Sequence, residues 1–252
     1  MEITIVGSGT VVPRLERRQS CVVVEAGGEV LVFDLGAGAV TGMVAAGLDP
    51  FATDRIFFTH FHPDHTADAA NLLFAMNYGT NEPRTNTLHV TGPEPFESFW
   101  SSILEVWGEW MEENYPIRTR ELPHTCDSPL ELDGCSLTWA PAVHRPESIS
   151  YRLDGENGAF VYTGDTEYSV SVVDLARGAD TLLIECSTPD NAPVPGHLTP
   201  GGVARMAREA AVGRVVLTHL YPAVDDGRLP EAVENGFDGE VLVAHDGLRL
   251  NV

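Results

Sequence analysis

The sequence predicts an α/β fold in which two mixed β-sheets pack together and helices cover their outer faces. Apolar, strand-like runs are followed by helical patterns in both halves of the chain. Polar residues of the kinds that bind metals come directly after several of these runs. The 252 residues, 43% of them hydrophobic, are enough to bury a full core. Because functional side chains gather where strands end, we expect an active site along one edge of the sheets.

The first part of the chain is predicted to be mostly strand. The expected strands are residues 2–6, 21–26 and 30–33, the last two forming a hairpin. Gly7-Ser8-Gly9 follows the first strand but lacks the third glycine and the helix of a dinucleotide-binding motif. Asp34 ends the third strand and opens a helix expected to reach about Leu48. Its carboxylate is either the cap of that helix or an acceptor that holds a neighbouring loop.

The middle of the chain alternates strands and helices. The expected elements are a strand at 56–58, a helix at 66–78, turns at 79–86, a strand at 88–91 and a helix from 94 to about 114. Aromatic residues recur at helical spacing in the last of these. We expect them to form an ordinary buried face, or a face between two copies of the chain, rather than a base-stacking surface.

The rest of the chain is predicted to be mostly strand, with two further helices. Strands are expected at 117–122, 130–132, 136–143, 148–153, 159–163, 181–185, 214–218, 241–244 and 248–251, the last two as a pair. Helices are expected at 169–177 and 200–211. No repeat, low-complexity linker or change in composition marks a boundary, so residues 1–252 are expected to form one domain.

Charge and composition narrow the class of partner. The chain has no lysine, 15 arginines and 37 acidic residues, which gives a net charge of -22. Such a surface repels phosphates, so binding to a large nucleic acid or an anionic membrane is not expected. Arg14, Arg17 and Arg18 form a short basic loop, which we expect to be solvated. The four scattered cysteines are expected to be buried free thiols, and the absence of a leader or a long apolar segment indicates a soluble, cytoplasmic protein.

A dense cluster of potential metal ligands lies in the segment Thr59-His60-Phe61-His62-Pro63-Asp64-His65. Histidine and aspartate are ligands that zinc and similar divalent ions prefer. His144, Asp165 and His219 each follow another predicted strand, so they are expected at the same edge. Together these form a set of seven candidate ligands, which is enough for two ions that share a carboxylate. The set is His60, His62, Asp64, His65, His144, Asp165 and His219.

In these residues the chain resembles the metallo-β-lactamase-fold hydrolases, and among them the ribonuclease Z-like branch. The matching segments are Asp34 in Phe-Asp-Leu-Gly, the run from His60 to His65, His144, Asp165 in Gly-Asp-Thr, His219 in Leu-Thr-His, Glu185-Cys-Ser-Thr and Gly196-His197-Leu-Thr. The resemblance implies a four-layer αββα sandwich with a binuclear site, usually of zinc, although Mn²⁺, Fe²⁺ or Ni²⁺ can occupy the same ligands. It also implies that His60, His62 and His144 hold one ion, Asp64, His65 and His219 hold the second, and Asp165 bridges them.

The candidate catalytic residues are Asp64, His197 and Glu185. His197 is expected to donate a hydrogen bond or a proton to the developing oxyanion or the leaving group. Glu185 ends the preceding strand and is expected to orient the His197 imidazole. The alternative for His197 is a structural role at the entry to a helix. His89, His124 and His245 are expected to be structural or surface residues.

The substrate is less well defined than the site. The resemblance suggests tRNA processing, but ribonuclease Z enzymes carry a long tRNA-binding arm, in bacterial forms between the ligands that match His144 and Asp165. Here those residues are only 21 positions apart, and a predicted hairpin fills the interval. We therefore expect a phosphodiesterase for a small phosphodiester or cyclic nucleotide, with a metal-bridging hydroxide as nucleophile. Arg145 and Tyr221, beside two ligands, are candidate pocket residues or simply solvent-facing ones.

Three alternatives stay open. The same metal site suits a carbonyl substrate, as in a lactonase, a thioesterase or an arylsulfatase-like esterase. A ribonuclease Z activity and a non-catalytic metal-binding protein are the other two. The resemblance also leads us to expect a homodimer.

Overall fold

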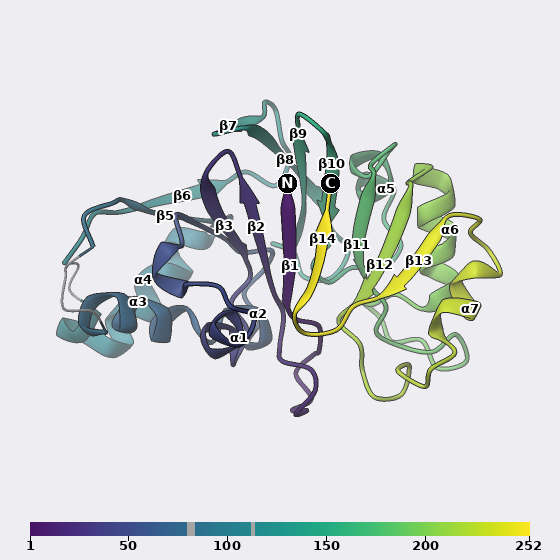
Figure 1. Ribbon diagram of the computed structural model, residues 1–252, viewed down its shortest axis with the longest axis horizontal. Coiled ribbons are helices and arrows are strands. Elements are labelled where there is room, and N and C mark those ends of the chain that lie inside the picture. The colour runs from purple at the N-terminus through teal and green to yellow at the C-terminus, as the bar shows by residue number, and fades with distance from the viewer. Residues whose placement is uncertain (80–83, 112–113) are drawn as a thin grey trace.

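The computed structural model describes residues 1–79, 84–111 and 114–252, and its strands form two seven-stranded sheets (Figure 1). The first sheet contains β1 (Glu2–Gly7), β2 (Cys21–Ala26), β3 (Glu29–Phe33), β4 (Arg55–Phe57), β5 (Leu88–Pro93), β6 (Ile117–Leu122) and β14 (Leu248–Asn251). The second contains β7 (Leu130–Leu132), β8 (Cys135–Pro141), β9 (Ile149–Gly155), β10 (Gly158–Tyr162), β11 (Thr181–Glu185), β12 (Arg214–Thr218) and β13 (Glu240–Val243).

Both sheets are mixed, as the sequence predicts. The strand orders are β14-β1-β2-β3-β4-β5-β6 and β13-β12-β11-β10-β9-β8-β7. In the first sheet β3 to β6 are parallel neighbours, and in the second β10 to β13 are. The remaining pairs are antiparallel. Parallel strands end at a common edge, so each sheet brings several loops together there.

Helices cover the outer face of each sheet and complete the four-layer αββα sandwich. The α-helices are α1 (Ala39–Ala45), α2 (Pro63–Thr66), α3 (Ala69–Tyr78), α4 (Phe96–Trp107), α5 (Val170–Leu175), α6 (Pro200–Ala210) and α7 (Leu229–Glu234), and two 3₁₀ helices span Pro50–Ala52 and Gly108–Met111. One apolar cluster lies between the sheets, and two more lie between a sheet and its helices. In the described ranges, none of the helices is long and apolar enough to cross a membrane.

Aromatic side chains in the central cluster support the edge where the polar loops meet. The Phe33 and Phe57 rings stack with centroids 5.1 Å apart, and the edge of Tyr151 meets both rings. The Tyr151 hydroxyl donates to Phe58 O at 2.7 Å, and the buried Tyr162 hydroxyl donates to an Asp34 carboxylate oxygen at 2.9 Å. The apolar core therefore fixes the backbone from which the polar loops begin.

The two C-terminal strands do not pair with each other, so that prediction is wrong. β13 pairs with β12 in the second sheet, whereas β14 crosses to the first sheet and pairs with β1. This crossing brings the chain ends side by side (Figure 1), and Val252 N donates to Met1 O at 3.0 Å. The short segment between the two strands gave no sequence signal for a change of sheet.

The predicted helices differ from the observed ones mainly at their ends. α1 begins five residues after Asp34, because the Asp34 carboxylate is used elsewhere and its backbone adopts a φ of 59°. The helix expected at 66–78 begins earlier, with Pro63 at the first position of α2, and is interrupted before α3. The helix expected from 94 to 114 ends at Trp107, where Gly108 has a φ of 55°. α7 was not predicted.

The aromatic face of α4 is only partly buried. Phe96 and Trp100 lie in the core, but Trp107 and, just beyond α4, Trp110 are 53% and 57% exposed. The expectation of an ordinary buried face therefore fails for the end of this segment. Residues 80–83, in the predicted turn, and 112–113, in the predicted helix, lie outside the described residues. Of the four free cysteines, three are buried as expected, and Cys126 is half-buried.

The basic loop after β1 is tied to the C-terminal half rather than solvated. Arg14 and Arg17 both pair with the Asp225 carboxylate, at 2.9 and 2.8 Å. Arg18 pairs with Asp246 at 3.2 Å, and its backbone N donates to the same carboxylate. The Arg17 side chain is only 10% exposed. These contacts join loops that are about two hundred residues apart in sequence.

Candidate metal centre

The seven candidate ligands come from four loops at one edge of the two sheets. His60 and His62 follow β4, and Asp64 and His65 lie on the short helix α2 that begins at Pro63. His144 follows β8, Asp165 follows β10, and His219 follows β12. The structure therefore brings together all seven residues that the sequence placed at strand ends.

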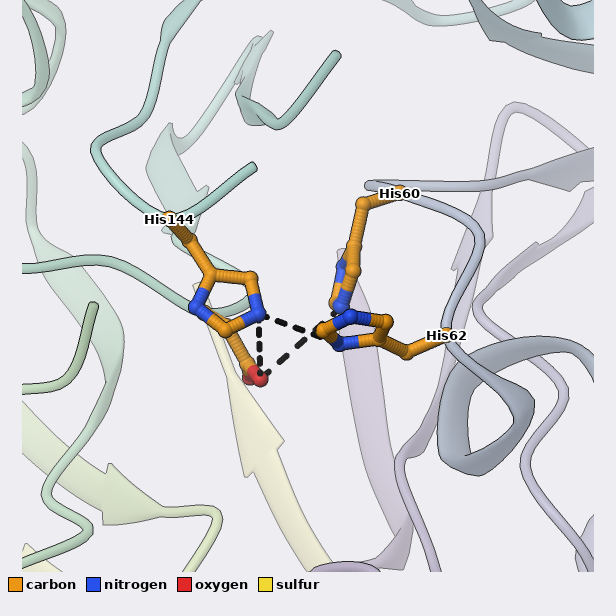
Figure 2. Close-up of side chains that lie close together, drawn as sticks. His60, His62 and His144 are labelled. Atoms are coloured by element: carbon orange, nitrogen blue, oxygen red, sulfur yellow. Dashed lines mark hydrogen bonds and ion pairs between the residues drawn. The ribbon is translucent and has the colours of Figure 1, made fainter. Parts of the chain in front are cut away.

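The first donor group consists of His60, His62, His144 and Asp165. Figure 2 shows the His144 ring reaching toward His60 and His62 from the opposite side. His62 Nδ1 and His144 Nε2 are 3.1 Å apart. Asp165 Oδ2 lies 3.6 Å from His144 Nε2 and 3.9 Å from His60 Nε2. Four potential ligand atoms thus face one small volume, within 4.8 Å of one another.

The second donor group consists of Asp64, His65 and His219. Asp64 Oδ2 is 3.5 Å from His219 Nε2. Asp165 Oδ1 lies 3.3 Å from His65 Nε2 and 3.4 Å from His219 Nε2. Asp165 therefore presents one oxygen to each donor group, which is the arrangement that a bridging carboxylate requires.

Several atoms in this centre lack the partners that buried polar atoms normally have. His60 Nε2, His219 Nε2 and Asp165 Oδ1 are buried and form no hydrogen bond within the described residues. Such atoms cost free energy unless something else satisfies them. Imidazole nitrogens and carboxylate oxygens that converge in this way are the donor set of a borderline divalent cation. The residues present fit such an ion in each donor group.

The buried carboxylate of Asp34 orients the histidines that come from the first sheet. It accepts from His65 Nδ1 at 2.7 Å, and from Thr59 N at 2.8 Å and Thr59 Oγ1 at 2.9 Å. Since the Thr59 hydroxyl gives its hydrogen to Asp34, it can accept from His60 Nδ1 at 3.0 Å. Both rings are thereby held with Nε2 free to bind an ion. Of the two roles considered for Asp34, the structure supports the acceptor and not the helix cap.

His144 is held by a different partner, the backbone of Gly196. Its Nδ1 donates to Gly196 O at 2.9 Å, and Gly196 N donates to a Glu167 carboxylate oxygen at 2.7 Å. Gly196 has a φ of 87°, and a Cβ at this position would lie 2.8 Å from His144 Nδ1. Glycine is required here both for the backbone conformation and for the close approach.

Glu185 performs the orienting role on the second sheet. It is fully buried and accepts from His197 Nδ1 at 3.0 Å. It also accepts from Ser187 Oγ at 2.5 Å, and Ser187 Oγ is 2.9 Å from His219 Nδ1. His197 stacks on His219 with ring centroids 5.7 Å apart. One ligand atom from each of Asp165, His197 and His219 also lies within 4.8 Å, so His197 is close enough to the centre to bind an ion as well.

The pKa shifts of its residues favour binding of a cation in the first donor group. Burial lowers the pKa of His60 well below its usual value, and it also lowers the pKa of His62 and of His144. Burial opposes ionisation of Asp165, but His219 and His65 hold its pKa well below the ordinary value. Neutral imidazoles around an ionised carboxylate are the state that binds metal.

His197 has the opposite tendency. Burial lowers its pKa, but the hydrogen bond and charge of Glu185, together with the charges of Asp165 and Asp64, outweigh that effect, so the net pKa is raised. Burial raises the pKa of Glu185 itself. The pair therefore favours an imidazole that keeps a proton on Nε2 while Nδ1 donates to the carboxylate.

Arg145 and Tyr221 lie at the rim of the centre. Arg145 is exposed and forms no ion pair within the described part of the chain; its positive charge adds to burial in lowering the pKa of His62. The half-buried Tyr221 ring is 6.1 Å from His197 and 6.0 Å from His219. Both positions are compatible with contact to a bound substrate.

Sequence reasoning missed the hydroxyl residues that orient the ligands. Thr59 and Ser187 lie inside segments singled out from the sequence, but nothing in their spacing indicated which ring each would contact. Tyr162, which donates to Asp34, precedes Asp165 by only three residues. His89, His124 and His245 belong to none of the donor groups among the residues that the structure describes.

The family of the chain follows from comparison with known proteins. Residues 32–220, most of the chain, match the family described as the Beta-lactamase superfamily domain. The chain belongs to the beta-lactamase superfamily. Its two seven-stranded sheets flanked by helices are the fold of the metallo-β-lactamase members. That fold implies divalent metal ions, and the chain has a His and Asp cluster that could hold them.

Individual proteins place the chain more closely within the superfamily. Ribonuclease Z of Mycobacterium avium (strain 104) is 27% identical over 275 residues, covering 100% of this chain and 98% of that protein. The metallo-beta-lactamase fold protein YhfI from Bacillus subtilis has a TM-score of 0.86 at 24% identity, covering 99% of this chain and 98% of that one. The short form of human tRNase Z has a TM-score of 0.81 at 22% identity, covering 100% and 99%. This superfamily member is a metal-dependent hydrolase of the ribonuclease Z-like branch.

Proposed function

We propose that this hydrolase is a phosphodiesterase with two divalent ions, zinc by preference, that acts on a small phosphodiester such as a cyclic nucleotide. The observation that carries the proposal is the position of Asp165, which gives one oxygen to each donor group. Ions bound there would act as Lewis acids that offset negative charge on a phosphate and lower the pKa of water. Mn²⁺, Fe²⁺ or Ni²⁺ suits the same donor set.

In this proposal His197 supplies the proton that the leaving group needs. Its Nδ1 is committed to Glu185, and its raised pKa favours a second proton on Nε2. Nε2–H can then donate to the leaving oxygen as the phosphorus–oxygen bond breaks. Asp64 stays ionised: burial raises its pKa, but His219 and His65 together lower it further, so the net pKa lies below the ordinary value. Its role is to hold the second donor group and keep the site anionic enough to bind cations.

Three features support a small substrate. The interval between His144 and Asp165 contains the β9–β10 hairpin, which leaves no space for a long arm. The alignment with the Mycobacterium avium protein spans 275 positions against 252 residues here, so that protein has segments with no counterpart in this chain. The net charge of -22 disfavours a long polyanion, whereas one exposed guanidinium beside the centre, that of Arg145, suits one phosphate.

A ribonuclease is the second candidate function. The observation in its favour is that proteins named for cleavage of RNA match this chain along essentially their whole length. RNA cleavage uses the same phosphodiester chemistry, so the two candidates differ in how the substrate is bound and not in the catalytic groups.

The proposal is tested by substrate panels on the zinc-loaded protein. We expect turnover of bis-(p-nitrophenyl) phosphate and of cyclic nucleotides, with no cleavage of a precursor tRNA and background rates on lactones and thioesters. An Asp165→Asn variant controls for contaminating hydrolases, since it should lose diester turnover. Precursor tRNA cleaved far faster than the small diesters would favour the ribonuclease. Lactone or thioester turnover well above diester turnover would show that the substrate is a carbonyl compound.

A further inference from the structure

The Glu185 carboxylate connects the site residues that come from the second sheet. Its buried carboxylate accepts from Thr166 N at 2.6 Å and from Leu198 N at 3.1 Å, as well as from His197 Nδ1 and Ser187 Oγ. Thr166 follows Asp165, and Leu198 follows His197, so one carboxylate fixes the backbone beside two site residues. Burial of a charge that accepts four hydrogen bonds is tolerated because every donor is aimed at it.

Ser187 connects the Glu185 carboxylate to His219, a candidate metal ligand. The side chain is fully buried, and its Oγ lies 2.5 Å from Glu185 Oε2, 2.9 Å from His219 Nδ1 and 3.0 Å from His219 O. A hydroxyl has one hydrogen to donate and two lone pairs to accept with. The carboxylate oxygen is the closer and charged acceptor, so it takes the hydrogen. The lone pairs are then left for His219 Nδ1–H, and His219 Nε2 is free to face the second donor group.

The histidine that Ser187 holds has an unusual backbone. His219 has a φ of 53°, in the left-handed region that residues other than glycine rarely adopt. Its ring has no other hydrogen-bond partner among the described residues, because Nε2 is unsatisfied without an ion. Among the described residues, the hydrogen bond that fixes the direction of the ring is therefore the one between Nδ1 and Ser187 Oγ.

We infer that Ser187 is a positioning residue that sets the cation affinity of the second donor group and links it to His197 through Glu185. This inference rests on the metal centre of the proposed function. In the first donor group, the His60 and His144 rings are anchored by Thr59 and Gly196 and not by Ser187. Loss of the hydroxyl should therefore weaken one ion and not the other.

The test compares Ser187→Ala with Ser150→Ala. Ser150 is also fully buried and donates a hydrogen bond to Thr163 O at 2.7 Å, but among the described residues it forms no hydrogen bond with a site histidine. Zn²⁺ affinities are measured by competition with a chromophoric chelator, and Co²⁺ titrations followed by visible absorption report the surroundings of each ion. Thermal unfolding of the metal-free proteins checks that the variants fold.

We expect two ions in the wild-type protein and in Ser150→Ala. In Ser187→Ala one ion should bind as before, and the other should bind about 10- to 100-fold more weakly, as for loss of the group that orients a ligand. The Co²⁺ spectrum should change for only one equivalent, and Ser187→Thr, which keeps the hydroxyl, should recover affinity. Equal affinities in Ser187→Ala and wild type, or equal weakening of both ions, would overturn the inference. Because metal binding needs no substrate, failure of diester turnover by the loaded wild type would overturn the proposed function alone.

Discussion

Replacement of Asp34 by asparagine should destabilise the fold because four donors converge on this one carboxylate. Thr59 N lies 2.8 Å from one oxygen, while Thr59 Oγ1, His65 Nδ1 and the Tyr162 hydroxyl lie 2.9, 2.7 and 2.9 Å from the other. Asparagine keeps the shape and tolerates the positive φ, but it has a single acceptor oxygen. If that oxygen faces the three donors, the amide NH₂ meets Thr59 N, and a buried N–H loses its partner.

The expected cost of Asp34→Asn combines that unsatisfied N–H with loss of the charged acceptor for His65. Together these give about 2–4 kcal/mol of unfolding free energy. The measurement is urea unfolding of the metal-free protein in the presence of a chelator. The control for the same substitution at an exposed position is Asp180→Asn, where the carboxylate accepts one backbone N–H, from Ala159 at 2.8 Å, and the amide oxygen can replace it. An Asp34→Asn protein within about 0.5 kcal/mol of wild type would refute the argument that all four donors need a carboxylate.

Three further predictions concern turnover of the small diester. His197→Ala should lower kcat by about 10²- to 10⁴-fold while two ions remain bound; loss of one ion would instead make His197 a ligand. Glu185 raises the pKa of His197, so activity that needs protonated His197 should persist to higher pH and fall as pH rises through that pKa. In a pH profile of kcat/KM, Glu185→Gln should shift this alkaline fall to lower pH. A fall at the same pH in Glu185→Gln and wild type would show that Glu185 does not raise the pKa of His197. Arg145→Gln should raise KM for the anionic diester about tenfold with little change in kcat. Arg177→Gln, at another exposed position, should change neither constant. Equal effects of the two substitutions on KM would mean that only the net charge of the protein matters.

Much of the fold could be predicted because its signals are local. Apolar runs such as 181–185 and 214–218 predict strands with the observed ends, since 181–185 is buried throughout and 214–218 is buried after Arg214. The strand exchange of 241–244 and 248–251 was missed, because both segments have the same pattern and only tertiary pairing separates them. The helix after Asp34 was placed too early for a related reason, since the aspartate is a plausible cap until its distant donors are known.

The candidate ligands could be predicted from the sequence because they lie at strand ends. Asp165 and His219 follow strands of the parallel part of the second sheet, whose ends share one edge. His144 follows β8, which has antiparallel neighbours but ends at the same edge. The orienting residues were harder: Thr59 and Ser187 are ordinary hydroxyl side chains, and the positive φ of His219 has no sequence signal. The Arg17 to Asp225 contact was likewise invisible, because it joins two loops that meet only in the folded chain.

The central claim is that Asp165 joins two donor groups that each hold a divalent ion. Metal content of the zinc-reconstituted protein after removal of free ions, measured beside Asp165→Asn, tests it most directly. We predict two ions per chain in wild type. In Asp165→Asn both affinities should fall, because Asp165 presents one oxygen to each group. One ion or none in the wild type, or two tightly held ions in Asp165→Asn, would contradict the claim.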